Sequence, residues 1–183
     1  MSNLKEEFIS RERVFDGEIL HVVKDEVLLP NGRRASREIC LHNGAVAIIP
    51  ILSDGCVIME RQYRYALDRV FLEIPAGKLD FSGEDPLLAA ARELREETGA
   101  VAARYTHIGR LITSPALVSE VIDMYLAEDI SFTERELDED EFIDVEKISL
   151  DELHKMVMSG EITDAKTQIA VLKAREIIKG RGN

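Results

Sequence analysis

The first part of the chain, residues 6–42, alternates between apolar and polar positions with the period of β-strands. The stretches EILHVVKDEVLL and ASREICLH are separated by Pro30-Asn31-Gly32, residue types that favour a tight turn. This pattern predicts a β-hairpin inside a small strand-rich unit.

A continuous apolar run, GAVAIIPIL at 44–52, then replaces the alternation. Such runs are typical of strands that are buried on both faces. Asp54-Gly55 predicts a turn into a second strand, CVIMERQYR, and a further short strand at VFLEIPA ends before Gly77.

The period changes at residues 86–98, where the sequence predicts a helix with clear ends. Asp85 is a suitable N-cap, Pro86 suits the first helical position, and Gly99 suits the position after the last turn. The apolar stripe of this helix consists of Leu87, Ala90, Ala91 and Leu94.

The rest of the chain predicts strands at 104–113, 119–128 and IDVEKIS, followed by helices at LDELHKMVMSG and AKTQIAVLKAREIIKG. Strands and helices do not alternate regularly, which favours the α+β class, with a mixed sheet sandwiched between helices. We predict an N-terminal β-strand unit at residues 1–42 and a main domain at 43–183.

Glu93, Glu96 and Glu97 share one face of the predicted 86–98 helix, near its C-terminal end. Like charges at this spacing repel each other, and carboxylates at a helix C-terminus oppose the helix dipole. Because both charge interactions destabilise the helix, we expect divalent cations to compensate for them. The plain alternative is a solvated helix face.

The chain of 183 residues has a formal net charge of −12 and a pI of about 4.8. This balance argues against an extended nucleic-acid surface, because phosphate backbones bind basic patches. The N-terminus has no signal-peptide pattern, no apolar run is long enough for a membrane span, and the two cysteines, Cys40 and Cys56, fit reduced thiols. We therefore expect a cytoplasmic protein without membrane partners.

The stretch GKLDFSGEDPLLAAARELREETGA, residues 77–100, resembles the Nudix box, G-x5-E-x7-R-E-U-x-E-E-x-G-U, in which U is aliphatic. Glu84, Arg92 and Gly99 occupy the matching places from the first glutamate onward. The first glycine departs from the pattern, since six residues rather than five separate Gly77 from Glu84. We interpret the extra residue as part of a loop that precedes the helix.

The resemblance implies a hydrolase of the Nudix type, with an α/β/α sandwich. It implies that Glu93, Glu96 and Glu97 bind metal together with the backbone carbonyl of Ala76, and that two or three Mg²⁺ or Mn²⁺ ions bridge to a bound diphosphate. Magnesium prefers such oxygen ligands. Gly77, Glu84, Arg92 and Gly99 would be structural, the ion pair of Arg92 and Glu84 holding the loop against the helix.

The stretches RQYRYALDRVFLEIPAGKLD and SPALVSEVIDMYLAE resemble the ADP-ribose pyrophosphatase branch of the family. This resemblance implies hydrolysis of ADP-ribose to AMP and ribose 5-phosphate by a homodimer. It also implies that the N-terminal unit, residues 1–42, serves for dimerisation and substrate contacts, so that active sites are shared across the interface. It also implies substrate contacts from Arg37, Arg64, Glu73 and Pro115. Plain alternatives exist: Arg64 could be a surface arginine, Arg37 could form an ordinary salt bridge, and Pro115 could simply terminate a strand. Glu120 is either a solvent-side strand residue or a substrate contact.

The acidic run ERELDEDEFIDVE at 134–146 resembles the catalytic loop of the same branch. The resemblance implies that Glu139 activates water, acting with Glu93 and Glu97, and that Glu141 approaches a metal. Neighbouring acids between 138 and 141 could substitute for Glu139, and such runs are often solvated loops.

Two other functions stay open from the sequence. The first is a Nudix hydrolase of another substrate: a different nucleotide sugar, a dinucleoside polyphosphate or a nucleoside triphosphate. The second is a module that senses ADP-ribose without cleaving it. Metal-dependent product release would exclude the second.

Overall fold

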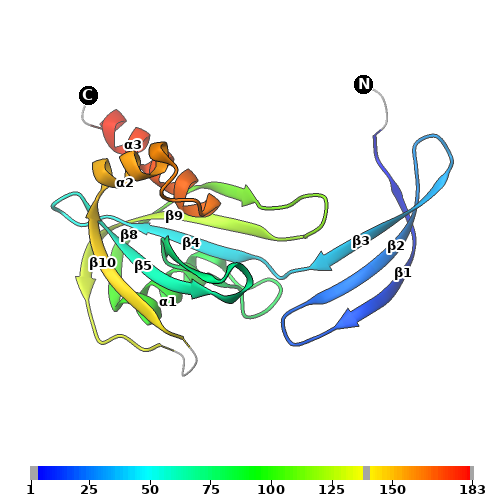
Figure 1. The fold of residues 1–183 in the computed structure, drawn as a ribbon, viewed down its shortest axis with the longest axis horizontal. Helices are drawn as coiled ribbons and strands as arrows, with labels where there is room; N and C mark the ends of the chain where they lie inside the picture. Colours follow the sequence, from blue (N-terminus) through cyan, green and yellow to red (C-terminus); the bar gives the residue numbers. More distant parts are fainter. Residues whose placement is uncertain (1–3, 138–140, 182–183) are drawn as a thin grey trace.

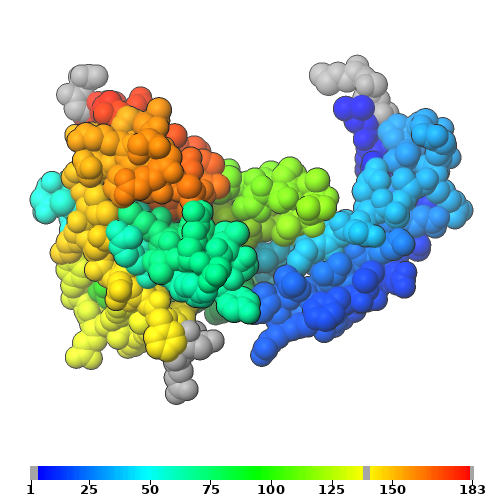
Figure 2. Space-filling view, in the orientation of Figure 1, coloured from blue at the N-terminus to red at the C-terminus, as the bar shows by residue number. Residues whose placement is uncertain are grey.

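The computed structural model describes residues 4–137 and 141–181 (Figure 1). The N-terminal sheet is antiparallel and has the order β1-β2-β3, formed by β1 (Glu7–Asp16), β2 (His21–Leu28) and β3 (Arg34–Leu41). As predicted, Gly32 turns β2 into β3, with φ of 79°. This sheet projects away from the rest of the molecule (Figures 1 and 2).

A mixed sheet of order β7-β4-β9-β8 lies at the centre of the remaining chain. Its strands are β4 (Ala45–Pro50), β7 (Ala76–Lys78), β8 (Ala100–Ile112) and β9 (Val121–Phe132). β4 runs parallel to β9, and the other pairs are antiparallel. Every residue of β4 is buried, which explains the continuous apolar run.

A second antiparallel sheet has the order β10-β5-β6, with β5 (Cys56–Arg64), β6 (Arg69–Glu73) and β10 (Ile143–Ser149). A short 3₁₀ helix, η1 (Tyr65–Leu67), connects β5 to β6. Alternate residues of β5 enter two different cores: Val57 and Met59 enter one, and Ile58 enters the other. The sheet therefore joins the two cores.

The helices pack on opposite faces of the mixed sheet. α1 (Pro86–Thr98) packs through Ala90 and Leu94 against Val46 and Ile48. α2 (Leu150–Ser159) and α3 (Ala165–Arg181) cover the other face, where Val171 joins the core of Ile49 and its neighbours. The observed architecture is the predicted α+β arrangement, with a mixed sheet between helices.

The structure differs from the sequence-based prediction at several strand boundaries; β9, for example, spans Val121–Phe132 where 119–128 was expected. The short strand expected at VFLEIPA is divided into β6 and β7, because Pro75 cannot donate a hydrogen bond to a neighbouring strand. Its carbonyl instead accepts a hydrogen bond of 2.8 Å from the Ile48 backbone N–H. β8 begins at Ala100 rather than 104, directly after the helix-ending Gly99.

The N-terminal sheet is joined to the main body near the end of β3. The backbone of Cys40 bonds to Leu117 (2.8 Å) and to Ser119 (3.0 Å), and the His42 N–H donates to the Ser119 hydroxyl at 2.8 Å. The predicted division at residues 42 and 43 falls in this junction and stays a prediction. In the described residues, no helix is long and apolar enough to cross a membrane.

Candidate active site

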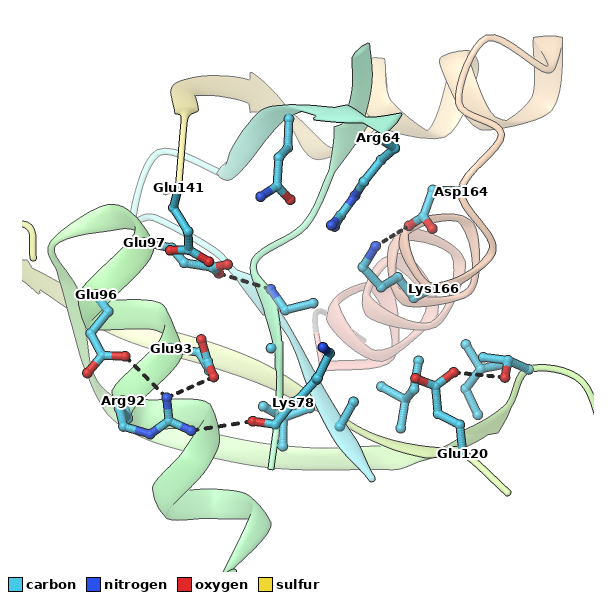
Figure 3. Close-up of a pocket in the computed structure, with 18 of the residues that line it drawn as sticks. Arg64, Lys78, Arg92, Glu93, Glu96, Glu97, Glu120, Glu141, Asp164 and Lys166 are labelled. Carbon is cyan, nitrogen blue, oxygen red and sulfur yellow. Dashed lines mark hydrogen bonds and ion pairs between the residues drawn. The ribbon is translucent and has the colours of Figure 1, made fainter. Parts of the chain in front are cut away.

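A cavity of about 620 Å³ opens between α1, the β7 edge of the mixed sheet and the first turn of α3 (Figure 3). Acidic side chains of α1 and of the segment before β10 line one wall, and Arg64, Asp164 and Lys166 line the opposite wall. The cavity therefore places an acidic wall and a mixed, cation-bearing wall face to face.

α1 presents its carboxylates to the cavity because its ends and its apolar stripe fix its rotation. The Asp85 side chain caps the helix by accepting a hydrogen bond of 2.8 Å from the Leu87 N–H, and Gly99 ends it with φ of 70°. Leu94 is fully buried in the core. Glu93 and Glu97, which lie next to each other along one edge of that stripe, then face the cavity.

Gly77 lets the Glu93 carboxylate approach the backbone of β7. A Cβ atom at position 77 would lie 2.0 Å from Cδ of Glu93 and 2.1 Å from its Oε1. Only glycine leaves this space free, so the first glycine of the motif supports the position of Glu93. The extra residue between Gly77 and Glu84 leaves this contact in place.

Glu97 is 4% exposed and holds the same segment from the side of α1. Its Oε2 accepts a hydrogen bond of 3.0 Å from the Ala76 N–H. Burial raises the pKa of Glu97 to about 10, and the charges of Glu60, Glu93 and Glu141 add to the effect. Burial likewise raises the pKa of Glu93 to about 7. Ionised carboxylates are thus unfavourable here unless a cation neutralises them.

Arg92 connects the helix, the loop before it and β7. Its guanidinium lies 2.9 Å from Glu93 Oε1, 3.2 Å from Glu96 Oε2 and 3.6 Å from Glu84 Oε1, and it donates a long hydrogen bond of 3.4 Å to the Lys78 carbonyl. These contacts hold the 77–84 loop against α1.

The donor set of the acidic wall fits a hard divalent cation. Carboxylate and carbonyl oxygens are the preferred ligands of Mg²⁺, which binds through one or two carboxylates, waters and substrate phosphates. Within the part of the chain that the structure describes, no three acidic, histidine or cysteine side chains already converge on one metal position. The substrate and water would therefore supply the remaining ligands.

Arg64 on the opposite wall is held by Glu73. Its Nε and Nη2 donate hydrogen bonds of 2.9 and 2.8 Å to the two carboxylate oxygens of Glu73. Lys166 forms an ion pair with the same carboxylate and lies 3.1 Å from Asp164. Burial opposes ionisation of Glu73, but the bonds from Arg64 and the charge of Lys166 outweigh it and lower the pKa of Glu73.

The α3 residues of this wall were missed by the sequence analysis. The Asp164 carboxylate accepts hydrogen bonds from the Thr167 N–H (2.9 Å) and hydroxyl (2.6 Å), as an N-cap residue does. The sequence predicted that this helix begins at Ala165, but no local signal indicates that Lys166 reaches the cavity. That position depends on how α3 packs.

Glu120 also lines the cavity, at its junction with the N-terminal sheet. Its carboxylate accepts a hydrogen bond of 2.8 Å from the Thr113 hydroxyl and lies 3.5 Å from His42 Nε2. His42 Nδ1 accepts a hydrogen bond of 3.0 Å from the Gly44 N–H, so Nε2 carries the ring proton and faces Glu120.

The structure brings together most, but not all, of the predicted site residues. Those that line the cavity are Arg64, Ala76, Gly77, Arg92, Glu93, Glu96, Glu97 and Glu141. Glu73 lies behind Arg64 and holds it. Glu84 contacts Arg92, and Gly99 ends the helix.

Two other predicted residues, Arg37 and Pro115, lie away from the cavity. Arg37 lies on β3, outside the cavity, and its guanidinium binds Glu6, with Nε 3.0 Å from Oε2. Pro115, in the loop between β8 and β9, does not line the cavity either. Glu139 lies outside the described residues. A single chain therefore leaves Arg37 and Pro115 away from the acidic wall.

Comparisons with known proteins agree with this geometry. Residues 41–168 match the family model of the NUDIX domain. An ADP-ribose pyrophosphatase of Bacillus subtilis is 42% identical over 185 residues, which cover 99% of this chain and 100% of the relative. A methanol dehydrogenase activator of Bacillus methanolicus is 41% identical over 179 residues, 96% of either chain. A crystal structure of an ADP compounds hydrolase has a TM-score of 0.87 and 28% identity, covering 97% of this chain and 96% of that chain.

Proposed function

The chain belongs to the Nudix hydrolase family, and on that premise we propose that it hydrolyses ADP-ribose with water to AMP and ribose 5-phosphate. The observation that carries this proposal is the polarised cavity, in which carboxylates face Arg64 and Lys166. An anionic diphosphate fits between such walls only if cations cover the acidic wall. The name of the Bacillus subtilis relative supports ADP-ribose as the substrate.

The acidic wall would hold Mg²⁺ or Mn²⁺ through Glu93, Glu96, Glu97, Glu141 and the Ala76 carbonyl, with two or three ions as the expected number. When bound, divalent ions neutralise a diphosphate and lower the pKa of a coordinated water. The protein's own contribution is to orient the carboxylates: Gly77 makes room for Glu93, and the Ala76 N–H fixes Glu97.

Arg64 is the cation best placed to orient the substrate from the opposite wall. Its guanidinium is fixed by two hydrogen bonds to Glu73, and its side chain is 43% exposed. A guanidinium held in this way binds phosphate or ribose oxygens without losing further side-chain freedom. Glu73 acts by holding Arg64 and Lys166.

A carboxylate that binds metal is a poor proton acceptor, so the general base should be a residue other than the metal ligands. We propose Glu139 for this role, on the resemblance of its loop to the catalytic loop of the branch. Its role is to take a proton from the attacking water. Arg37 and Pro115 would act in the site of a second copy of the chain, in a cytoplasmic homodimer.

The first experiment is a substrate panel with Mg²⁺ or Mn²⁺, in which released monophosphates are measured after phosphatase treatment. ADP-ribose should rank first among nucleotide sugars, dinucleoside polyphosphates and nucleoside triphosphates. A chelator should abolish the activity, and either metal should restore it. A clear preference for a nucleoside triphosphate contradicts the substrate assignment. Tight binding of ADP-ribose without product supports the sensing module.

The second experiment is Glu97→Gln, which should lower kcat by a hundredfold or more because a metal ligand loses its charge. The fold should persist, since the glutamine oxygen still accepts the hydrogen bond from the Ala76 N–H. Glu152→Gln, at an exposed position on α2, is the matched control and should keep normal activity. Wild-type turnover in Glu97→Gln would show that the ligand assignment is wrong.

A further inference from the structure

Lys78 is the last residue of β7 and belongs to the floor of the cavity. Side chains alternate across a strand, so Lys78 shares its face with Ala76, which also lines the cavity. Figure 3 shows its ammonium pointing up into the cavity, between the carboxylates of α1 and the Lys166 side chain. The lysine is thus placed between the two walls.

The other cations that line the cavity already have partners. Arg64 binds Glu73, Lys166 binds Glu73 and Asp164, and Arg92 binds Glu93 and Glu96. Among the described residues, the Lys78 ammonium has neither an ion pair nor a hydrogen bond. A cation in a cavity rich in carboxylates that pairs with none of them is available to an anionic ligand.

The backbone of Lys78 is fixed on both sides. The residue pairs with Ala45 of β4, its carbonyl accepts the bond from Arg92, and the next N–H, of Leu79, donates to the Gly44 carbonyl at 3.1 Å. The Cα position is therefore set by the sheet and by α1, and only the side chain is free to adjust to a ligand.

We propose that Lys78 is a substrate-binding residue whose ammonium contacts the diphosphate on the side turned away from the metal-binding carboxylates. This inference rests on the proposed function for the identity of the substrate, but it requires only that the ligand carries a diphosphate. Lysine binds phosphate oxygens as a compact charge. The floor and the acidic wall would then hold the same group from two directions.

A contact made equally in the bound substrate and in the transition state changes KM more than kcat. Lys78→Met keeps the aliphatic stem and removes the charge, so KM for ADP-ribose should rise about tenfold or more, the usual effect of losing a charge-assisted hydrogen bond. Lys78→Arg should recover most of the loss. The thermal midpoint should stay at the wild-type value, because the ammonium has no partner within the described chain.

Two lysine variants serve as comparisons. Lys155→Met removes an exposed ammonium on α2, outside the cavity, and should leave KM and stability unchanged. Lys166→Met removes a partner of the buried Glu73 carboxylate and should lower the thermal midpoint as well as activity. Of the three lysine variants, only Lys78→Met should thus raise KM without lowering the thermal midpoint.

A binding measurement separates this proposal from the proposed function. Magnesium imidodiphosphate, a diphosphate analogue, serves as a probe of binding without turnover. In titration calorimetry its dissociation constant should be about tenfold or more higher for Lys78→Met than for the wild type. This binding measurement tests Lys78 even if ADP-ribose proves not to be the substrate. Equal affinity of the two proteins for the probe, or an unchanged KM in Lys78→Met, would overturn the role of Lys78.

Discussion

At the residue scale, the position of the Glu93 carboxylate depends on the missing side chain of Gly77. Gly77→Ala should lower kcat about a hundredfold, since a methyl group would displace the Glu93 carboxylate by an ångström or more. Turnover of ADP-ribose at saturating Mg²⁺ measures this effect.

Gly180→Ala provides the control for that substitution. Gly180 lies in α3, with no atom within 4 Å of the added Cβ. This variant should keep full activity and gain slightly in stability, because alanine favours a helix more than glycine does. If Gly77→Ala behaved like Gly180→Ala, the position of Glu93 would not depend on the glycine.

Glu60 is a buried acid that the proposed mechanism does not use. It is 3% exposed on β5, and within the described residues its Oε1 has no hydrogen-bond partner. Burial raises its pKa to about 8; the Arg135 and Lys166 charges oppose this shift, and those of Glu73 and Glu141 reinforce it. The carboxyl group therefore keeps its proton in the folded state at pH values where the unfolded chain has lost it.

This shift predicts a pH-dependent stability. Between about pH 4.5 and 8, unfolding releases the Glu60 proton, so the free energy of unfolding falls as the pH rises. Glu60→Gln removes the titration, and its thermal midpoint should fall less than that of the wild type between pH 5 and 8. Scanning calorimetry across this range makes the comparison. Glu152→Gln should follow the wild-type curve, and parallel curves for Glu60→Gln would contradict the prediction.

At the scale of elements, the segment Glu73–Lys78 is held between two helices. On one side, the Ile74 N–H donates a hydrogen bond of 3.0 Å to the hydroxyl of Thr167, which is fully buried at the start of α3. On the other side, Glu97 and Arg92 of α1 bind Ala76 and Lys78. The segment Glu73–Lys78, which carries the proposed metal ligand Ala76, therefore depends on both helices.

Thr167→Val should weaken this arrangement. The variant has nearly the same shape but leaves the buried Ile74 N–H without a partner, which should cost about 1–3 kcal/mol of unfolding free energy. Chemical denaturation measures the loss, and the Mg²⁺ concentration for half-maximal activity should rise with it. Thr163→Val removes an exposed bond from Arg69 and should change stability by less than about 0.5 kcal/mol. Equal losses in the two variants would exclude a special role for Thr167.

The elements differ in how far their sequences predict them. α1 was predicted from Pro86 to Thr98 because its caps and its apolar stripe are local signals. The division of β6 from β7 and the early start of β8 were missed, since both depend on pairing with distant strands. For the same reason the sequence did not indicate that Lys166, Lys78 and Glu60 surround the site.

At the scale of the whole molecule, the N-terminal sheet presents apolar side chains to solvent. Phe8, Val14 and Phe15 of β1 are each more than half exposed, and every residue of this strand is classed as exposed. Exposed apolar patches of this kind often mark interfaces between chains. They support the proposed homodimer.

A mixing experiment tests both the dimer and the shared site. Arg37→Gln and Glu97→Gln should each be nearly inactive as pure proteins. After unfolding and refolding as an equal mixture, half of the dimers would be hybrids with one intact site, and about a quarter of wild-type activity should return. Absence of any recovery would mean that Arg37 does not act across an interface. Sedimentation of the wild type gives the oligomeric state independently.

The sandwiching of Glu73–Lys78 between α1 and α3 has a consequence for how the enzyme is made. A chain leaves the ribosome from its N-terminus, so the carboxylates of α1 emerge well before Asp164 and Thr167. Until α3 has emerged, the segment Glu73–Lys78 is held by α1 alone. A nascent chain halted before α3 should consequently contain the complete Nudix box and yet hydrolyse nothing.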